Sequence, residues 1–582
     1  MARAFDENGR EVVLRPWQER GVAQLREAIE RGLPVSIISE PPGSGKTLTV
    51  LMAIADYLDK HKKALVLVPY ASISTMWTKY RIINDEGREI KIALFHAKRF
   101  HRCWLEVTQT ADSPIIPCND VKKSFSDKLK SCIYYAPPTW DSSNPKLRKV
   151  GEYQTIWGKK QVNVHALGGA CDYYKQYQEI VDADVIVMTH TKFFYEYMYR
   201  RVPKPYFLVI DEAEMFPQEL IAKFYLSEED IDKLAKALQG VSPNVVAELI
   251  AIKHLLKKGM RQININQLLE LYEKAYGRRP GPFNYSTAYV SNGKILLLHD
   301  YYFNVQTEVM SVSKMMIGIV GTPLEDSEIA EILRVRNFYK ISNNQKLLGR
   351  LIVYSNGQMP VKGIWFKRPD MYKGEVEMVC GELRKFFEWS EKLKLPVFIP
   401  VITYRHVSLC RDVVKEAVAR RLSCDEDTGR CKKTGRFIED EIVDKTGKHI
   451  EEFIEGKRDI LITAKANRGI HFPQKTLAQI IVKRPWPDLE DPFVKWLQDE
   501  RGKYNLSTRY RKMVELHGRA TLFHMLGRSI KSEDDTVVVF TPDRNVIDTI
   551  EQIKGIIQID VTYAKSVDEI ASYLFEHQKI HF

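Results

Sequence analysis

The sequence predicts an α/β protein with two parallel-sheet domains, and two observations support that class. Short apolar runs recur along the chain, separated by stretches with helical spacing, which is typical of parallel strands covered by helices on both faces. Two inserts of different composition interrupt this rhythm before residue 345, so we expect one domain on each side of that position. The runs that we interpret as strands are Ala64–Val68, Val185–Met188, Phe207–Ile210, Met316–Val320, Val397–Ile402, Ile460–Thr463, Leu477–Val482 and Thr536–Phe540.

The inserts differ from each other. Residues 99–180 are basic and aromatic and contain four cysteines, whereas residues 218–300 are mostly helical by pattern. We expect both to belong to the first domain, because strand-like runs of that domain lie before, between and after them. The predicted division is 1–98, 181–217 and 301–344 for the first domain, 99–180 and 218–300 for the inserts, and 345–582 for the second domain.

Composition and net charge limit the domain organisation and the kinds of partner that we expect. The 582 residues allow roughly three to five domains, and 44% of them are hydrophobic, enough for real cores. The net charge of +12 makes a polyanion a reasonable partner, although a generic basic surface would have the same charge. No apolar run approaches the ~20 residues of a membrane span. The first residues contain no apolar signal core, so we expect a cytoplasmic protein without a membrane partner.

A candidate phosphate-binding loop follows a short apolar strand at residues 33–39 and opens a helix at residues 48–57. Its strict form requires a glycine at position 40, where this chain has Glu40. Glycines let backbone N–H groups turn toward a phosphate, Lys46 supplies a charge and Thr47 a hydroxyl for Mg²⁺. A plain glycine turn before a helix is the alternative. The nucleotide-binding residues that we predict in this loop are Gly43, Ser44, Gly45, Lys46 and Thr47.

A second motif follows another apolar strand, residues 207–210. Asp211 and Glu212 come directly after it, and the carboxyl ends of parallel strands are where α/β proteins bind ligands. One carboxylate, Asp211, can hold Mg²⁺ through water, while Glu212 can activate the attacking water. Acidic residues also occur at strand ends as plain caps. With the phosphate loop upstream, the pair indicates nucleotide hydrolysis.

The order of these and further motifs resembles that of the superfamily 2 helicases, and within them the XPD/DinG family of iron–sulfur DNA helicases. The match extends over nearly the whole chain, and departures at positions 468, 471, 524 and 531 lie in the second domain. The segments that carry it are Leu14–Gln18 (glutamine motif), Ala183–His190 (the segment before the acidic box), Asp211–Glu214 (DEAH box, with Glu214 for histidine), Gly321–Thr322 (third motif), Val397–Tyr404 (the strand opening the second motor domain), Arg468–Phe472 (fifth motif, usually E-G-I-D-F), His524–Lys531 (sixth motif, usually Q-x-x-G-R-x-x-R) and Asp543–Arg544.

The resemblance implies two RecA-like motor domains that bind ATP and Mg²⁺ between them. It implies that Gln18 reads adenine. It also implies that charges from the second motor domain reach the γ-phosphate, at positions that correspond to Arg528 and Lys531. Because arginine grips phosphate in a bidentate fork and lysine acts as a point charge, we assign the catalytic finger to Arg528. Lys531 then has a supporting role or faces solvent.

Four cysteines of the first insert, Cys103, Cys118, Cys132 and Cys171, have 14, 13 and 38 residues between successive members. Four thiolates suffice for a [4Fe–4S] cluster. Zinc is an alternative, but structural zinc sites usually contain a tight C-x(2–4)-C pair and none occurs here. Ordinary thiols are the third possibility. The Cys-Asp-Tyr-Tyr sequence at Cys171 resembles the family's last cluster cysteine, and the wide spacing resembles members related to FANCJ more than short-spaced XPD proteins.

The remaining cysteines carry less information. Cys424 and Cys431 bracket a turn-like sequence that could hold them across a hairpin. We expect free surface thiols there, with a disulfide as the alternative. Cys380 and Cys410 lie in helical patterns and are expected in the core.

Two clusters of aromatic and basic residues predict a single-strand path, because rings stack on bases and cations follow phosphates. Each cluster could also be a solvated basic face with core aromatics. The first consists of Lys98, Arg99, Arg102, Trp104, Lys122, Lys123, Lys130, Tyr134 and Tyr135. The second consists of Trp486, Phe493, Lys495, Trp496, Arg501, Tyr504, Arg509, Tyr510 and Arg511.

The resemblance implies an ATP-dependent DNA helicase that moves 5′ to 3′ on single-stranded DNA, unwinds forked duplex DNA, and acts as a monomer in repair or replication. The cluster insert would be the strand-separating wedge, and the helical insert would resemble the family's arch. One alternative is an RNA or RNA–DNA hybrid unwinder. Another is a nucleic-acid-binding scaffold with a slow ATPase, which the altered motifs of the second domain favour.

Overall fold

The structure of the protein is a computed structural model. It describes residues 2–41, 43–106, 108–111, 113, 116–119, 124–139, 148–158, 161–166, 171–240, 243–257, 264–277, 279–342, 346–401, 404–444, 447–464, 472–485, 487, 491–498, 507–527, 530 and 534–578.

The two α/β domains are called motor domains below, after the role predicted from the sequence. The first is built on a seven-stranded sheet in which every neighbouring pair is parallel. Its strands, in spatial order, are β14 (Tyr339–Ile341), β2 (Val35–Ser39), β13 (Met315–Val320), β9 (Phe207–Asp211), β3 (Ala64–Val68), β8 (Val185–Thr189) and β5 (Ile92–Phe95). The helices of this domain are α1 (Pro16–Glu30), α2 (Lys46–Ile54), α3 (Ala71–Ser74), α6 (His190–Met198), α7 (Phe216–Glu219), α11 (Tyr302–Val305) and α12 (Asp326–Leu333).

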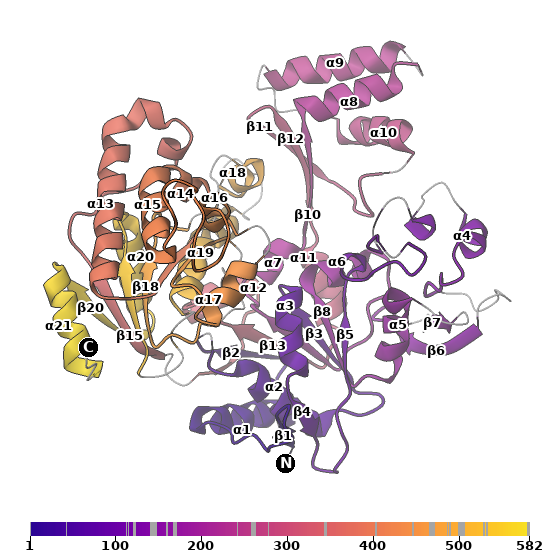
Figure 1. Ribbon diagram of the computed structural model, residues 1–582. Helices are drawn as coiled ribbons and strands as arrows, with labels where there is room; N and C mark the ends of the chain where they lie inside the picture. Colours follow the sequence, from indigo (N-terminus) through magenta and orange to yellow (C-terminus); the bar gives the residue numbers. More distant parts are fainter. Residues whose placement is uncertain are drawn as a thin grey trace.

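The second motor domain contains a six-stranded, fully parallel sheet (Figure 1). Its strands, in spatial order, are β17 (Ile460–Thr463), β16 (Val397–Pro400), β18 (Thr476–Ile480), β19 (Thr536–Phe540), β15 (Lys346–Tyr354) and β20 (Gln558–Ala564). Its helices include α13 (Lys373–Lys392), α14 (Arg405–Ser408), α15 (Arg411–Leu422), α16 (Ile438–Ile442), α17 (Lys448–Ile454), α18 (Pro492–Gln498), α19 (Ser507–Leu526), α20 (Arg544–Lys554) and α21 (Val567–Gln578). All eight predicted strands belong to these two sheets, so the predicted fold class is confirmed.

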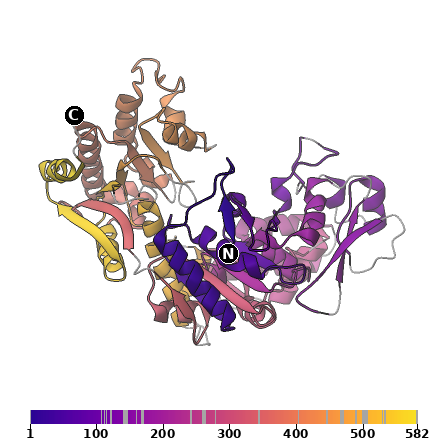
Figure 2. The same ribbon diagram turned by 90° about the horizontal axis from the view of Figure 1, so that it is seen from below.

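The cysteine insert lies on the side of the first motor domain that faces away from the second, as Figures 1 and 2 both show. Within it, β6 (Arg148–Gln154) and β7 (Gln161–Ala166) form an antiparallel pair. Two helices flank this hairpin in sequence, α4 (Phe125–Ser131) and α5 (Asp172–Asp182).

The helical insert contains a sheet that the sequence pattern did not predict. Helices α8 (Glu228–Leu238), α9 (Pro243–Lys257) and α10 (Ile265–Tyr276) sit on an antiparallel sheet of β10 (Ile221–Ser227), β12 (Lys294–Asp300) and β11 (Thr287–Ser291). The β11–β12 turn is Asn292–Gly293, with φ of +52° and +68°. Asn-Gly between strand-like runs is a strong hairpin signal, and it was available in the sequence.

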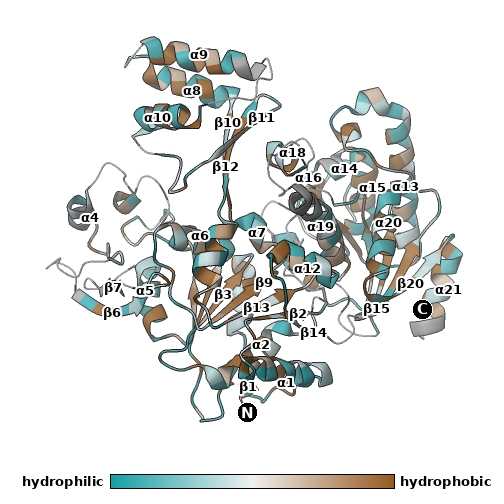
Figure 3. Cartoon of the chain, turned by 180° about the vertical axis from the view of Figure 1, so that it is seen from behind, coloured by the Kyte–Doolittle hydropathy of each residue, from teal (hydrophilic) through white to brown (hydrophobic). Residues whose placement is uncertain are grey.

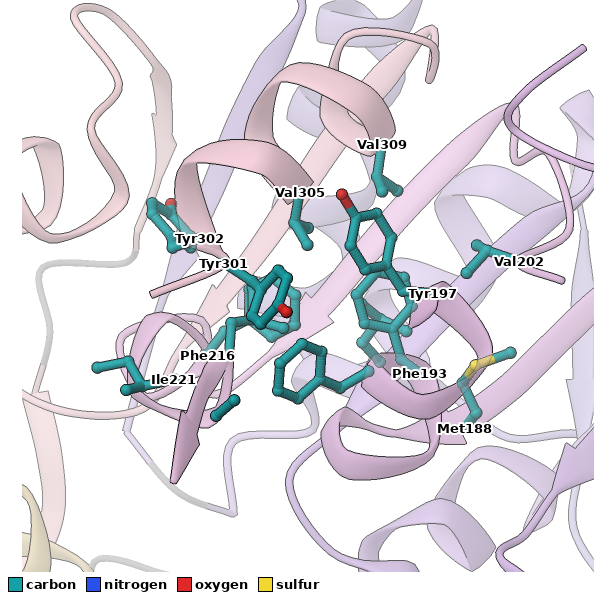
Figure 4. Close-up of a cluster of buried hydrophobic side chains, with 14 of the residues drawn as sticks. Met188, Phe193, Tyr197, Val202, Phe216, Ile221, Tyr301, Tyr302, Val305 and Val309 are labelled. Carbon is teal, nitrogen blue, oxygen red and sulfur yellow. The ribbon is translucent and has the colours of Figure 1, made fainter. Parts of the chain in front are cut away.

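Hydrophobic residues concentrate on the strands of both sheets (Figure 3). One cluster of buried hydrophobic residues extends from the first motor domain into both inserts, and Figure 4 shows part of it. Because the inserts share this core, a movement of either one must repack the motor domain beneath it. The labelled members are Met188, Phe193, Tyr197, Val202, Phe216, Ile221, Tyr301, Tyr302, Val305 and Val309.

Two disulfides occur in the second motor domain, where we expected free thiols at 424 and 431. Cys424 is bonded to Cys431, and both lie in a turn closed by an antiparallel bridge. Cys380 is bonded to Cys410, whose side chain is buried in the core as expected. The second bond joins α13 to the start of α15, so only the packing of those helices reveals it. Among the described residues, no helix is long and apolar enough to span a membrane.

Candidate functional site

The phosphate loop connects β2 to α2 at the carboxyl edge of the first sheet. Gly43 and Gly45 have φ of +78° and +91°, a backbone conformation that favours glycine. A Cβ added to Gly45 would lie 2.5 Å from Nε2 of Gln18, so a larger residue at this position would displace the amide of Gln18. Glu40, by contrast, has no positive φ and is buried. A side chain is therefore tolerated at the position where the strict motif has glycine.

Lys46 is directed back onto its own loop. Its Nζ donates to the carbonyl oxygens of Glu40 (2.7 Å) and Pro41 (2.8 Å). Burial lowers the pKa of Lys46, and the charges of Asp211 and Glu40 partly oppose that shift. The ammonium thus sits beside the acidic pair, where a bound phosphate could replace the loop carbonyls as its partner.

Gln18 links the first helix to this loop. Its Oε1 accepts from the backbone N–H of Arg15 (2.9 Å), and its Nε2 donates to the carbonyl of Gly45 (3.2 Å). Gln18 is buried in this arrangement. Its amide positions the phosphate loop, and its contact with adenine stays a prediction.

The acidic pair lies at the end of β9, between β3 and β13. Burial, together with the charge of Glu212, raises the pKa of Asp211 to about 7. Glu212 is a non-glycine residue with φ of +48°, and its N–H donates to Oδ1 of Asp211 (3.1 Å). Strained residues of this kind persist where the surrounding structure holds them, often at functional sites.

Glu214 is tied to the neighbouring strand end. Its Oε1 accepts from the hydroxyl of Thr322 (2.6 Å) and from the backbone N–H of Thr322 (3.2 Å). The residue that replaces histidine in the acidic box therefore connects the ends of β9 and β13. Sequence reasoning identified both segments but not their contact, because the contact depends on the order of strands in the sheet.

The second motor domain reaches this edge through α19. Nη2 of Arg519 lies 2.7 Å from Oε1 of Glu328 in α12, and Nε2 of His524 lies 4.0 Å from Oε1 of Glu212. A small cleft lies between the domains. Its lining residues are Ser39, Glu40, Pro41, Gly321, Thr322, Pro323, Phe523 and Ile557. Arg528, Lys531 and residues 468–471 lie outside the described residues, so the finger assignment stays a prediction.

The four cysteines of the first insert line one cavity. They come from different segments: Cys103 precedes the insert's helices, Cys118 lies in a short helical turn, Cys132 ends α4 and Cys171 caps α5. Lys98, Trp104 and Tyr173 line the same cavity. The fold therefore brings together thiols that the sequence separates widely.

Burial raises the pKa of the thiols of Cys118 and Cys171, and raises that of Cys132 to about 11. Ionisation of these three thiols would thus require a positive charge in the cavity, as metal centres supply. In the described part of the chain, no three histidine, cysteine or acidic side chains are grouped to hold one metal ion. The thiols instead surround a space, and a multi-atom cluster with four cysteine ligands needs such an arrangement.

The second aromatic cluster has a different environment from the one expected. Phe493 is buried, and Nζ of Lys223 lies 4.1 Å from its ring centroid. The hydroxyl of Tyr225 donates to Oδ1 of Asp491 (3.3 Å), so α18 is docked on the sheet of the helical insert. In this conformation Phe493 is not available to stack on a base. Trp486, Arg501 and Tyr504, like the side chains of Arg509, Tyr510 and Arg511, lie outside the described part of the chain.

In the first aromatic cluster, Trp104 is partly exposed and its Nε1 donates to Oδ2 of Asp172 (3.2 Å), whereas Tyr135 is buried. Lys122 and Lys123 are not among the described residues. The exposed members of this cluster stay candidates for contact with nucleic acid.

Comparison with known proteins supports the fold. Residues 11–114 match the family model of the Type III restriction enzyme res subunit. No curated protein matches the sequence. The structure is similar to that of an XPD helicase, with 16% identity and a TM-score of 0.55 over 95% of this chain and 100% of that chain. An apo XPD structure and Xpd4 of S. tokodaii each give 14% identity and a TM-score of 0.52 over 94% of this chain and 100% of theirs. At such identities the similarity shows the fold alone.

Proposed function

We propose that the protein is an ATP-dependent DNA helicase that moves on single-stranded DNA, 5′ to 3′, and unwinds forked duplex. The observation that carries the proposal is the meeting of the phosphate loop and the acidic pair at the carboxyl edge of one parallel sheet, with α19 of a second motor domain against it. Nucleotide binding between two such domains lets hydrolysis depend on closure of the cleft. The similarity to XPD structures supports the same proposal at the level of fold.

In this mechanism Lys46 binds the β- and γ-phosphates, and the backbone N–H groups at Gly43, Ser44 and Gly45 cradle them. Asp211 and Thr47 would hold Mg²⁺, which neutralises charge on the phosphates when bound. Glu212 orients the attacking water and accepts its proton.

Arg528 then stabilises the charge of the transferred phosphoryl group, with Lys531 in support. Hydrolysis in this arrangement requires that both motor domains contribute. In this proposal, closure of the two motor domains moves the single-stranded DNA past the two inserts.

The cysteine cavity would hold a [4Fe–4S] cluster through Cys103, Cys118, Cys132 and Cys171, because the four thiols surround one space. Such a cluster would brace the insert, whose described elements are short and whose two-stranded sheet is small. Braced in this way, the insert can act as a wedge at the fork. We propose that the protein works as a monomer in DNA repair or replication.

Two further candidates are a nucleic-acid-binding scaffold with a slow ATPase, which the altered motifs of the second motor domain support, and an unwinder of RNA or RNA–DNA hybrids. Strand displacement separates these functions. Labelled duplexes with a 5′ tail or a 3′ tail, in DNA, RNA and hybrid form, are incubated with ATP and Mg²⁺, with Lys46→Ala as the inactive control. We expect displacement of the 5′-tailed DNA alone. ATPase activity stimulated by single strands, without displacement of any duplex, would instead support the scaffold.

A further inference from the structure

His524 is a second-domain side chain that enters the candidate nucleotide site. It is buried near the end of α19, with Nε2 at 4.0 Å from Oε1 of Glu212. A Cβ placed on Gly321 would lie 3.3 Å from Cε1 of His524 and 3.9 Å from Nζ of Lys46. The absence of a side chain at Gly321 therefore lets the ring and the lysine approach the same strand end. The imidazole lies beside both the candidate base and the phosphate lysine.

The carboxylate that His524 approaches belongs to a residue with a strained backbone. Glu212 adopts a left-handed backbone conformation, which is unfavourable in a residue with a Cβ. A separation of 4.0 Å exceeds a hydrogen bond, and closure of the cleft by about 1 Å would bring the ring within bonding distance. With a proton on Nε2, His524 would then donate to the carboxylate and fix its orientation.

Two departures from the helicase pattern lie next to the Gly321–Thr322 strand end. Glu214 stands in place of the usual histidine of the acidic box, and His524 stands in place of the usual glutamine of the sixth motif. Because Glu214 is bonded to Thr322, the edge of the sheet carries a third carboxylate beside Asp211 and Glu212. An imidazole can supply both a donor and a positive charge to such a site, whereas a glutamine supplies a neutral amide. The two substitutions are thus chemically complementary.

We propose that His524 is a positioning residue for ATP hydrolysis, which holds Glu212 in its active orientation when the motor domains close. The proposal rests on the ATPase function proposed above. His524 acts through Glu212 and does not bind the phosphates, so it governs turnover and leaves nucleotide binding intact. Arg519, five residues earlier on α19, forms an ion pair with Glu328 of α12, so α19 contacts the first domain at a second point.

The test uses the full-length protein with single-stranded DNA. We expect His524→Leu to lower kcat by on the order of 10- to 100-fold, part of the effect of a positioned base, while KM and the Kd of a fluorescent ATP analogue change by less than about 3-fold. His524→Gln, which keeps a donor, should retain most of the activity. A Leu variant with normal kcat, or a Gln variant as impaired as the Leu variant, would overturn the proposal.

Glu214 offers an independent control, should the Leu variant fail to fold. Glu214→His alone places two imidazoles at the edge and should lower kcat, whereas Glu214→His combined with His524→Gln restores the usual pair and should recover part of it. If the losses of kcat in the two single variants simply add in the double variant, Glu214 and His524 do not act as a pair. If the wild-type protein hydrolyses no ATP, the proposed function fails. If it does and His524→Leu is equally active, only this inference fails.

Discussion

The first motor domain holds two like charges side by side at the carboxyl edge of its sheet, in addition to the buried ion pair of Lys192 and Glu196. A buried cluster of the second domain instead joins opposite charges. Asp211 and Glu212 lie side by side at the end of β9, and burial raises the pKa of Asp211. In the second domain, Arg458 and Glu441 are both fully buried and lie 3.0 Å apart. In the same region, the guanidinium of Arg436 donates hydrogen bonds to Glu441 and Glu452.

This comparison shows that buried charges can serve either a reaction or the packing of the fold. Like charges held together in a buried site destabilise the fold and persist where they serve chemistry. Opposite charges held together by hydrogen bonds join segments of chain and specify their packing. The cysteines follow the same division, because those of the first domain's insert surround a cavity and those of the second are bonded in pairs.

The largest effect is expected at the acidic pair and the loop. Glu212→Gln should bind ATP yet lose hydrolysis by more than about 10³-fold, because the water loses its base. Lys46→Ala should lose hydrolysis and also bind ATP more weakly, because the phosphates lose a cation. The ATP turnover rate with and without single-stranded DNA, together with the Kd of ATP, tests both variants. Normal turnover in either variant contradicts the site.

The contribution of the second domain can be tested at the sixth motif. Arg528→Ala should bind ATP but lose strand-stimulated hydrolysis by on the order of 10³-fold, the scale of arginine fingers elsewhere. Lys531→Ala should lose much less, since a lysine acts as a point charge. The same ATPase assay compares them. If Lys531→Ala is the more damaging change, the finger is the lysine.

The cysteine cavity should lose its metal when one ligand is replaced. Protein purified without oxygen should contain about four irons per chain and be brown, and serine at Cys103, Cys118, Cys132 or Cys171 should remove both iron and colour. ATPase activity should partly persist, whereas unwinding should be lost. Cys380→Ser is the matched control in the second domain and should keep its iron. Stoichiometric zinc without labile sulfide would show that the site is not an iron centre.

The disulfides should stabilise the second domain according to loop length. Their sequence separations are 30 for Cys380–Cys410 and 7 for Cys424–Cys431. The chain-entropy model gives about 4 and about 2 kcal/mol respectively. Thermal unfolding of Cys410→Ser and Cys424→Ser, with and without reductant, measures the difference. Equal Tm values for wild type under both conditions would mean that these bonds contribute nothing.

The smallest effect concerns pH. Burial, with Lys483 nearby, lowers the pKa of His406 to about 4, below the ordinary value near 6.5. Because the unfolded chain takes up a proton that the folded chain does not, this residue's contribution to stability is complete above pH 6.5 and is lost as the pH falls toward 4. We expect a loss of about 2 kcal/mol between pH 7 and pH 5.

The variant His406→Gln should remove that part of the pH dependence. His254→Gln, at an exposed histidine of the helical insert, is the control and should leave the dependence as it is. Denaturant unfolding at the two pH values provides the measurement. An unchanged slope in His406→Gln would mean that other groups cause the loss.

Local pattern was enough to predict most of the fold. The eight strands carry runs of apolar and β-branched residues that can only be buried on both faces, as in β3 and β19. The loop at Lys46 and the pair at Asp211 and Glu212 follow their strands directly, so the chain itself carries them to the sheet edge. The β11–β12 hairpin was missed although its Asn-Gly turn was present, because the helical pattern around it dominated the interpretation.

Tertiary structure decided which distant groups meet. The sequence by itself determined the class of fold, the loop and the acidic pair, because each depends on neighbours in the chain. The order of the strands brought Glu214 to Thr322, and the packing of α19 brought His524 to Glu212. Helix packing likewise joined Cys380 to Cys410, and docking of α18 buried Phe493. Contacts between residues far apart in sequence depend on how whole elements pack, and no local spacing records that packing.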